Sequence, residues 1–235
     1  MTQMKVIAHI HNSFKEKFGI PRQSGLIEDT QSVIVFEKQY RDENALRGIE
    51  EFSHLWLIWN FSKNNKETWS PTVRPPRLGG NKRMGVFATR SPFRPNPIGL
   101  SCVELVKVEK TKEYGVVLRV SGADLLDGTP IYDIKPYLCF TDSKPYAKCG
   151  FASQTKDYCL EVDFPKNLLQ KIDTDKREIL VRLLSQDPRP AYHNSNDRVY
   201  AMSFDKYEIK FVVCGQKKLK VTEINETFSE KEDAE

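Results

Sequence analysis

Short apolar runs recur through the first 140 residues and predict a mainly β structure. They occupy residues 6–10, 33–36, 55–61, 85–89, 101–108, 114–120 and 131–134. Many short strands separated by glycine and proline are typical of a β-barrel or a β-sandwich. The continuous run LWLIWNF at 55–61 predicts a fully buried strand, and a short helix is expected over 37–47, before Gly48.

The pattern changes beyond residue 142. Leucines and isoleucines between 165 and 185 recur at a spacing of three and four, which predicts amphipathic helix, broken near Asp173 with Thr174 as a candidate cap. Two further apolar runs, at 199–204 and 207–213, predict closing strands. We therefore expect a β-barrel domain over 1–142, a small α+β domain over 143–223 and a disordered acidic tail over 224–235.

Composition narrows the class of protein. The chain has 235 residues, of which 39% are hydrophobic, and no apolar stretch approaches the length of a membrane-spanning helix. Its five cysteines are odd in number and include no C-x-x-C pair, so neither a disulfide framework nor a structural zinc site is expected. The four histidines lack metal-ligand spacing. These features predict a cytoplasmic protein with reduced cysteines, no bound metal and no membrane partner.

The basic residues are unevenly distributed, although the net charge is only +4. Residues 68–103 contain no Asp or Glu, yet they include Arg74, Arg77, Lys82, Arg83, Arg90 and Arg94. Prolines and glycines in this stretch suppress regular structure, and Phe87 and Phe93 offer faces on which a base could stack. Guanidinium groups without local carboxylates suit phosphate or carboxylate ligands. The residues alone leave two interpretations open: a nucleotide-type site, or a structural loop whose arginines cap carbonyls.

Two other segments carry candidate chemistry. Asp124 and Asp127 precede Gly128-Thr129-Pro130, and such a turn either binds a ribose diol or an amine or is an Asx-turn without further role. In Pro21-Arg22-Gln23 a fixed φ precedes two side chains with several donors. The chain has no Walker A sequence and no G-x-G-x-x-G after a strand, which argues against a Rossmann methyltransferase.

Together these segments resemble the TrmO family, also called TsaA-like or YaeB-like proteins, over nearly the whole chain. The matching segments are 15–18, 21–26, 47–56, 71–80, 84–99, 124–130, 133–137 and 186–192. The resemblance implies a non-Rossmann β-barrel methyltransferase domain, a small C-terminal domain and a homodimer. It also implies S-adenosylmethionine as methyl donor and, as substrate, the exocyclic N6 nitrogen of threonylcarbamoyladenosine beside the tRNA anticodon.

The resemblance also implies the site residues. Carried over by motif, the cofactor contacts are Pro21, Arg22, Gln23, Arg90, Leu100, Asp127, Gly128, Thr129 and Pro130, together with Ser62 and Lys63, whose side chains depart from the family pattern. We expect Asp127 or Asp124 to act as catalytic base or to hold the cofactor ribose. The expected RNA contacts are Arg74, Arg77, Lys82, Arg83 and Arg94 for phosphates, with Arg94 or Arg189 for the threonyl carboxylate.

Two rival functions use the same residues. A non-catalytic RNA-binding module would need the basic stretch but would not bind S-adenosylmethionine. A hydrolase acting on a nucleotide or a modified base would need a metal cluster or a nucleophile–base pair, and the sequence shows neither.

Overall fold

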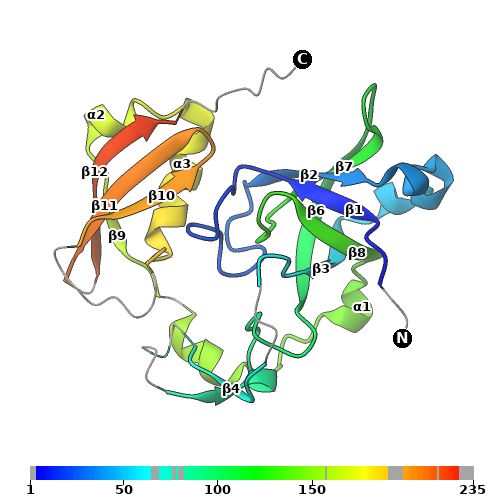
Figure 1. Cartoon of the computed structure of the whole chain (residues 1–235), viewed down its shortest axis with the longest axis horizontal. Helices are drawn as coiled ribbons and strands as arrows, with labels where there is room; N and C mark the ends of the chain where they lie inside the picture. Colours follow the sequence, from blue (N-terminus) through cyan, green and yellow to red (C-terminus); the bar gives the residue numbers. More distant parts are fainter. Residues whose placement is uncertain are drawn as a thin grey trace.

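Six antiparallel strands close into a barrel, in the order β1-β2-β7-β6-β3-β8 (Figure 1). The computed structural model describes residues 4–64, 69–75, 78, 82–156, 158–189, 198–215 and 217–227. The barrel strands are β1 (Ala8–His11), β2 (Gln31–Phe36), β3 (His54–Asn60), β6 (Ile98–Thr111), β7 (Gly115–Ser121) and β8 (Thr129–Pro136). The predicted mainly β fold with a barrel is confirmed.

Strand β3 lies between β6 and β8 and shows how the barrel core is built. Leu55, Leu57 and Trp59 are at most 6% exposed and point into the core, whereas Trp56 and Ile58 on the other face are only partly buried. The prediction of a fully buried strand is therefore wrong, because alternation along a strand turns every second side chain outwards.

Two predicted elements take a different form. Residues 37–47 contain two short 3-10 helices, η1 (Lys38–Tyr40) and η2 (Glu43–Leu46), in place of the one predicted helix, and η3 (Ile49–Glu51) follows. The carboxylate of Asp42 accepts a hydrogen bond from the Asn44 amide and starts a new turn there. The predicted strand 85–89 is reduced to β5 (Met84–Gly85), which pairs with β4 (Thr72–Val73), and the 3-10 helix η5 (Val86–Ala88) replaces the rest.

The C-terminal part forms a second sheet, in the order β10-β11-β12-β9. Its strands are β9 (Glu161–Asp163), β10 (Tyr200–Phe204), β11 (Tyr207–Cys214) and β12 (Lys218–Glu226), and its helices are α2 (Lys166–Leu169) and α3 (Thr174–Ser185). The predicted break between two helices is confirmed, but Asp173 rather than Thr174 occupies the N-cap position of α3. Along the chain, α1 (Cys139–Asp142) and the 3-10 helix η6 (Gly150–Thr155) come after the last barrel strand and before the first strand of this sheet.

Sequence patterning missed strand β12, which extends past residue 223 into the predicted acidic tail. Leu219, Val221 and Ile224 are buried on one face, but two consecutive polar residues, Thr222 and Glu223, interrupt the alternation where the pairing with β11 shifts register. Residues 228–235, the remainder of that predicted tail, lie outside the described residues. Within the described part of the chain, no helix is long and apolar enough to span a membrane.

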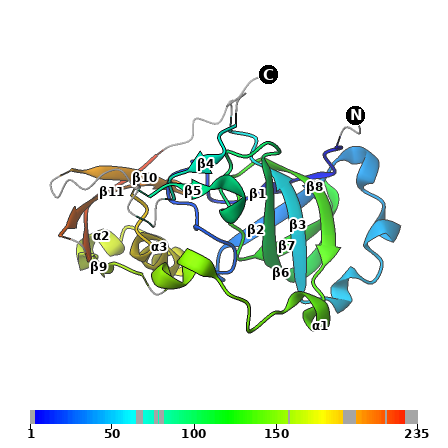
Figure 2. The same ribbon diagram turned by 90° about the horizontal axis from the view of Figure 1, so that it is seen from below.

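The loop between β1 and β2, residues 12–30, lies between the barrel and the C-terminal domain (Figure 2). Phe14 and Ile27 in this loop are 2% and 1% exposed and are buried in the hydrophobic core of the C-terminal sheet. Gly19 has a φ of 89°, and a Cβ there would lie 2.8 Å from Met202 Cε. We call this segment the bridging loop. It connects two barrel strands but packs against the other domain.

We predict that Gly99→Ala destabilises the barrel. A Cβ at Gly99 would lie 2.2 Å from the indole of Trp59, so the buried ring or the strand must move. Overpacking of this kind lowers the free energy of unfolding by about 1–3 kcal/mol, measurable by chemical denaturation. Gly85→Ala is the control, because nothing lies within 4 Å of its Cβ position. Equal losses for the two variants would contradict this account.

Candidate functional site

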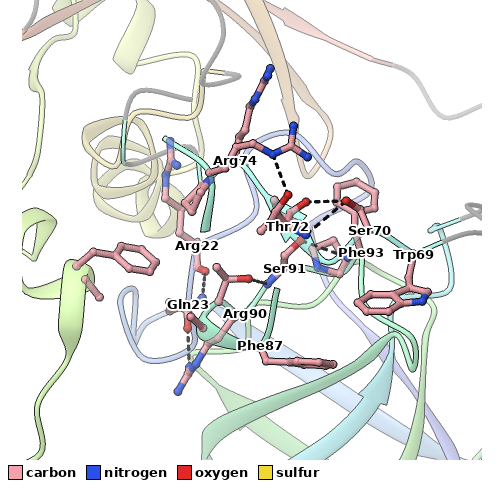
Figure 3. A pocket seen from close by; sticks show the side chains of 18 of the residues that line it. Arg22, Gln23, Trp69, Ser70, Thr72, Arg74, Phe87, Arg90, Ser91 and Phe93 are labelled. Carbon is pink, nitrogen blue, oxygen red and sulfur yellow. Dashed lines mark hydrogen bonds between the residues drawn. The ribbon is translucent and has the colours of Figure 1, made fainter. Parts of the chain in front are cut away.

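A cleft of about 1410 Å³ opens beside the barrel (Figure 3). Its walls are formed by the bridging loop, residues in and around β4, Arg83, the segment 87–93 and the start of helix η6. None of its described lining residues is Asp or Glu. Four arginines line it: Arg22, Arg74, Arg83 and Arg90. The acid-free character seen in the sequence is thus kept in space, and the cleft suits an anionic ligand.

Aromatic side chains form one wall of the cleft. Trp69 and Phe87 are 50% and 73% exposed, and their ring centroids lie 6.1 Å apart. Phe93 lines the same cleft. Large exposed aromatic faces beside cations are typical of surfaces on which bases stack. Sequence reasoning named Phe87 and Phe93 but missed Trp69, although it stands at the start of the acid-free stretch.

The predicted residues Arg22, Gln23 and Arg90 meet in one hydrogen-bonded chain (Figure 3). Arg90 Nη1 donates to Gln23 Oε1 at 2.6 Å, and Gln23 Nε2 donates to the Arg22 carbonyl at 2.5 Å. The Arg22 guanidinium points away from this chain, with Nε donating to the Gln186 carbonyl at 3.2 Å. A second nitrogen of Arg22 donates to the Asp187 carbonyl. Arg22 thereby contacts the C-terminal domain directly, and Arg90 is connected to that domain through Gln23 and Arg22.

Asp124 lies near Arg90 in a polar niche beside the barrel core. Ser101 Oγ donates to Asp124 Oδ1 at 2.5 Å, and Trp59 Nε1 donates to Ser101 Oγ at 2.9 Å. Burial raises the pKa of Asp124 above its usual value, against the hydrogen bonds and the charge of Arg90. A carboxyl group with a raised pKa beside a cleft is a candidate for proton transfer.

Asp127 has a different environment. Its carboxylate accepts hydrogen bonds from Lys15 Nζ at 2.7 Å and from the Asn12 amide at 2.9 Å. His11 Nδ1 lies 3.5 Å away. The ion pair holds this carboxylate against the start of the bridging loop. Of the two predicted catalytic candidates, Asp124 lies in the niche with Ser101 and Trp59, whereas Asp127 is held in an ion pair with Lys15.

Backbone hydrogen bonds bring the bridging loop beside the segment that carries both carboxylates. The Gly25 amide donates to the Gly122 carbonyl at 2.9 Å, and the Asp127 amide donates to the Phe14 carbonyl at 2.8 Å. Sequence reasoning named both segments, but their contact depends on strands that are distant in the chain.

The other predicted cofactor residues do not line the cleft. Pro21 is buried in the bridging loop, and Gly128, at a φ of 72°, leads into Thr129 and Pro130 at the start of β8. Leu100 is 52% exposed on β6. Ser62 follows β3, and the Lys63 carbonyl accepts a hydrogen bond from Lys17. The predicted set thus divides into a group at the cleft and a group on the strand ends of the barrel.

The predicted RNA contacts also divide. Arg74 and Arg83 line the cleft, and Lys82 is exposed beside it. Arg94 donates to the carbonyls of Thr89 and Ser91 at 3.0 and 3.4 Å, which braces its own loop. Arg189 forms a two-pronged ion pair with Asp187 at 2.7 and 2.8 Å. Arg77 lies outside the described residues.

A closed antiparallel barrel with an arginine-lined cleft, followed by a small α+β sheet, differs from the parallel Rossmann sheet and agrees with the barrel architecture that the resemblance implies. Residues 9–143 match the tRNA-methyltransferase O N-terminal domain, and residues 157–227 match the TrmO C-terminal domain. The chain belongs to the TrmO family, which confirms the resemblance seen in the sequence.

Relatives extend over most of the chain. It is 42% identical over 219 residues to the tRNA (adenine(37)-N6)-methyltransferase of Escherichia coli K12, covering 90% of this chain and 93% of that protein. A Pseudomonas aeruginosa protein named as a putative S-adenosylmethionine-dependent methyltransferase is 38% identical over 79% of this chain and 81% of its own length. The crystal structure of TrmO from P. aeruginosa superposes with a TM-score of 0.76 at 28% identity, covering 96% of this chain and 97% of that one.

We predict that Asp124→Asn stabilises the fold at neutral pH while it lowers activity. The raised pKa means that the folded chain holds the proton of Asp124 more tightly than the unfolded chain does, so the charged form costs stability at pH 7. The gain from the neutral amide shrinks as pH falls towards 3.8, the usual pKa of the group. Thermal melts between pH 4 and 8 measure this gain, and methyl-transfer rates should fall by roughly 10²-fold.

The matched control is Asp133→Asn. Asp133 pairs with Lys135 at 2.9 Å, and its side chain is 44% exposed. A gain of equal size at pH 7 in this variant would mean that burial is not the cause of the effect at Asp124.

Proposed function

We propose that this chain transfers a methyl group from S-adenosylmethionine to the N6 nitrogen of adenosine 37 in tRNA, with the threonylcarbamoyl form of that adenosine as substrate. The observation that carries the proposal is the likeness to the E. coli tRNA (adenine(37)-N6)-methyltransferase over 90% of the chain. The two matching domain models are the N-terminal and C-terminal domains of one family, so the likeness includes both domains of this chain. We also propose that it works in the cytoplasm as a homodimer.

The residues present fit the methyl donor. S-adenosylmethionine supplies an activated methyl group, and it carries a carboxylate, a ribose diol and an adenine. Arg90 at the cleft provides a cation for the carboxylate, and its side chain is oriented by Gln23. We propose that Asp127 and the Gly128–Pro130 turn contact the ribose, because these positions match the family motif. Leu100, Ser62 and Lys63 are proposed contacts on the same ground.

The cleft also fits an anticodon loop. Arg74 and Arg83 lie along its wall, and Arg83 Nε is oriented by a 2.8 Å hydrogen bond to Thr72 Oγ1. Cations facing solvent bind phosphates in a salt-dependent way. Trp69 and Phe87 offer faces to an unstacked base beside them. Arg189, by contrast, is already paired with Asp187, so Arg94 or one of the four arginines that line the cleft suits the threonyl carboxylate better.

The chain's part in the chemistry is alignment and proton transfer. The acceptor nitrogen lies in a urea-like group and is a weak nucleophile, so it gains from a group that takes its proton as the new bond forms. Asp124, with its raised pKa and its position beside Arg90, is the group that we propose takes this proton. Holding donor and acceptor in line contributes about 7–11 kcal/mol to lowering the barrier in favourable cases.

We predict methyl incorporation into threonylcarbamoyl-modified tRNA and at most background incorporation into the same tRNA transcribed without modification. The measurement uses radiolabelled donor with both tRNAs at equal concentration. Equal incorporation into the two would refute the claimed substrate. A chain that binds tRNA but neither S-adenosylmethionine nor its demethylated product would favour the rival reading, a non-catalytic RNA-binding module.

We predict that Phe87→Ala weakens tRNA binding about tenfold, because stacking of one base on an aromatic ring is worth about 1–3 kcal/mol. Fluorescence anisotropy with labelled anticodon stem-loop measures the dissociation constant. Phe140→Ala is the control: Phe140 on α1 is 83% exposed but is not among the residues that line the cleft. If both substitutions weaken binding equally, the aromatic wall is not the base-binding surface.

A further inference from the structure

The C-terminal domain surrounds the bridging loop, which carries Arg22 and Gln23. Beyond the burial of Phe14 and Ile27, polar contacts tie the loop at several points. The Asp205 amide donates to the Ser13 carbonyl at 3.1 Å, and Ser203 Oγ donates to Glu16 at 2.8 Å. An ion pair joins Arg182 to Asp29 near the other end of the loop. The loop is thereby attached to the C-terminal domain near both of its ends.

The turn after α3 is built around Asp187. This residue is 7% exposed and adopts a φ of 54°, a left-handed conformation that Gly, Asn and Asp adopt more readily than other residues. Its carboxylate accepts two hydrogen bonds from Arg189 and one from Tyr158 Oη at 2.9 Å. Burial opposes its ionisation, but these hydrogen bonds outweigh burial and hold the pKa of Asp187 below its usual value.

The backbone of the same turn contacts Arg22, one of the proposed methyl-donor residues. The carbonyls of Gln186 and Asp187 both accept hydrogen bonds from the Arg22 guanidinium. From Arg22 the contacts continue through Gln23 to Arg90, as described above. The side chain of Asp187 thus fixes the turn, and the turn fixes Arg22. The loop then presents Gln23 to Arg90, and this last contact is drawn in Figure 3.

We propose that Asp187 is a positioning residue for the methyl-donor site: the Gln186–Asp187 turn of the C-terminal domain holds Arg22, and through Gln23 it sets the orientation of Arg90. The proposal rests on the function proposed above. It gives the C-terminal domain a part in donor binding, although among the described residues that line the cleft none comes from its sheet or from helices α2 and α3.

The geometry explains why a carboxylate is needed at this position. The two carbonyls face the same guanidinium only while the turn keeps its unusual backbone conformation. Arg189 and Tyr158 hold the carboxylate from two sides, and this prevents the turn from relaxing. An arginine fork can bind two carbonyls at once, whereas a lysine at position 22 cannot do so with the same geometry.

The experiment measures binding of S-adenosylhomocysteine, the stable product of the donor, by calorimetry on the full chain. Asp187→Asn keeps the size and the backbone conformation but removes the charge that pairs with Arg189. We expect its dissociation constant to rise about tenfold, and that of Arg22→Lys to rise about as much. Because both changes break one network, the double variant should also bind about tenfold more weakly, rather than about a hundredfold.

Asp205→Asn is the matched control. Asp205 is in the same domain, has a φ of 55° and pairs with Lys176 at 2.5 Å, but its contact with the bridging loop is made by its backbone amide. This variant should lose stability yet bind the product within about twofold of the native chain. In turnover assays, Asp187→Asn should raise KM for the donor more than it lowers kcat.

Three outcomes would overturn the proposal: unchanged binding by Asp187→Asn, additive losses in the double variant, or an equal loss of binding in Asp205→Asn. Should Asp187→Asn fail to fold, Tyr158→Phe removes one hydrogen bond from the same carboxylate and must still weaken binding measurably. Failure of the native chain to bind S-adenosylhomocysteine would instead refute the proposed function, so the two failures are distinguishable.

Discussion

The packing of Phe14 and Ile27 into the C-terminal core is the interaction on which the rest of the structure depends. Both residues belong to a loop between two barrel strands, yet their side chains are buried in the other domain. Burying two large apolar side chains contributes about 1.5–3 kcal/mol each. This anchoring fixes the path of residues 12–30, and with it the place of Arg22 and Gln23 beside the cleft.

A second constraint is electrostatic. The cleft gathers four arginines without a carboxylate among its described lining residues, an arrangement in which the like charges repel one another. Hydrogen bonds to neutral acceptors, such as those from Arg83 to Thr72 and from Arg90 to Gln23, hold the side chains without cancelling their charge. Arg189, Lys15 and Arg119, outside the cleft, are instead paired with carboxylates. Positively charged side chains are therefore gathered where a ligand would lie.

Periodicity and turn residues were sufficient to predict the barrel strands and the broken helix of the C-terminal domain. They failed where a side chain redirected the backbone, as Asp42 does in the stretch predicted as a helix. They also failed at β12, where the polar residues Thr222 and Glu223 in succession interrupt the alternation. The candidate site shows the same division. Arg22, Gln23 and Arg90 could be named from the sequence, but not their connection to Asp187, because that contact joins residues more than 160 positions apart.

The shared loop has a consequence for the order in which the chain becomes functional during synthesis. A ribosome adds residues from the N-terminus, and domains generally fold as they emerge. The last barrel strand ends at Pro136, so the barrel has all its strands well before the C-terminal sheet exists. The apolar partners of Phe14 and Ile27 include residues up to Ile224. The two apolar side chains of the bridging loop thus remain uncovered until the C-terminal sheet has been synthesised, so all the barrel strands exist before the loop that forms one wall of the cleft can be fixed in place.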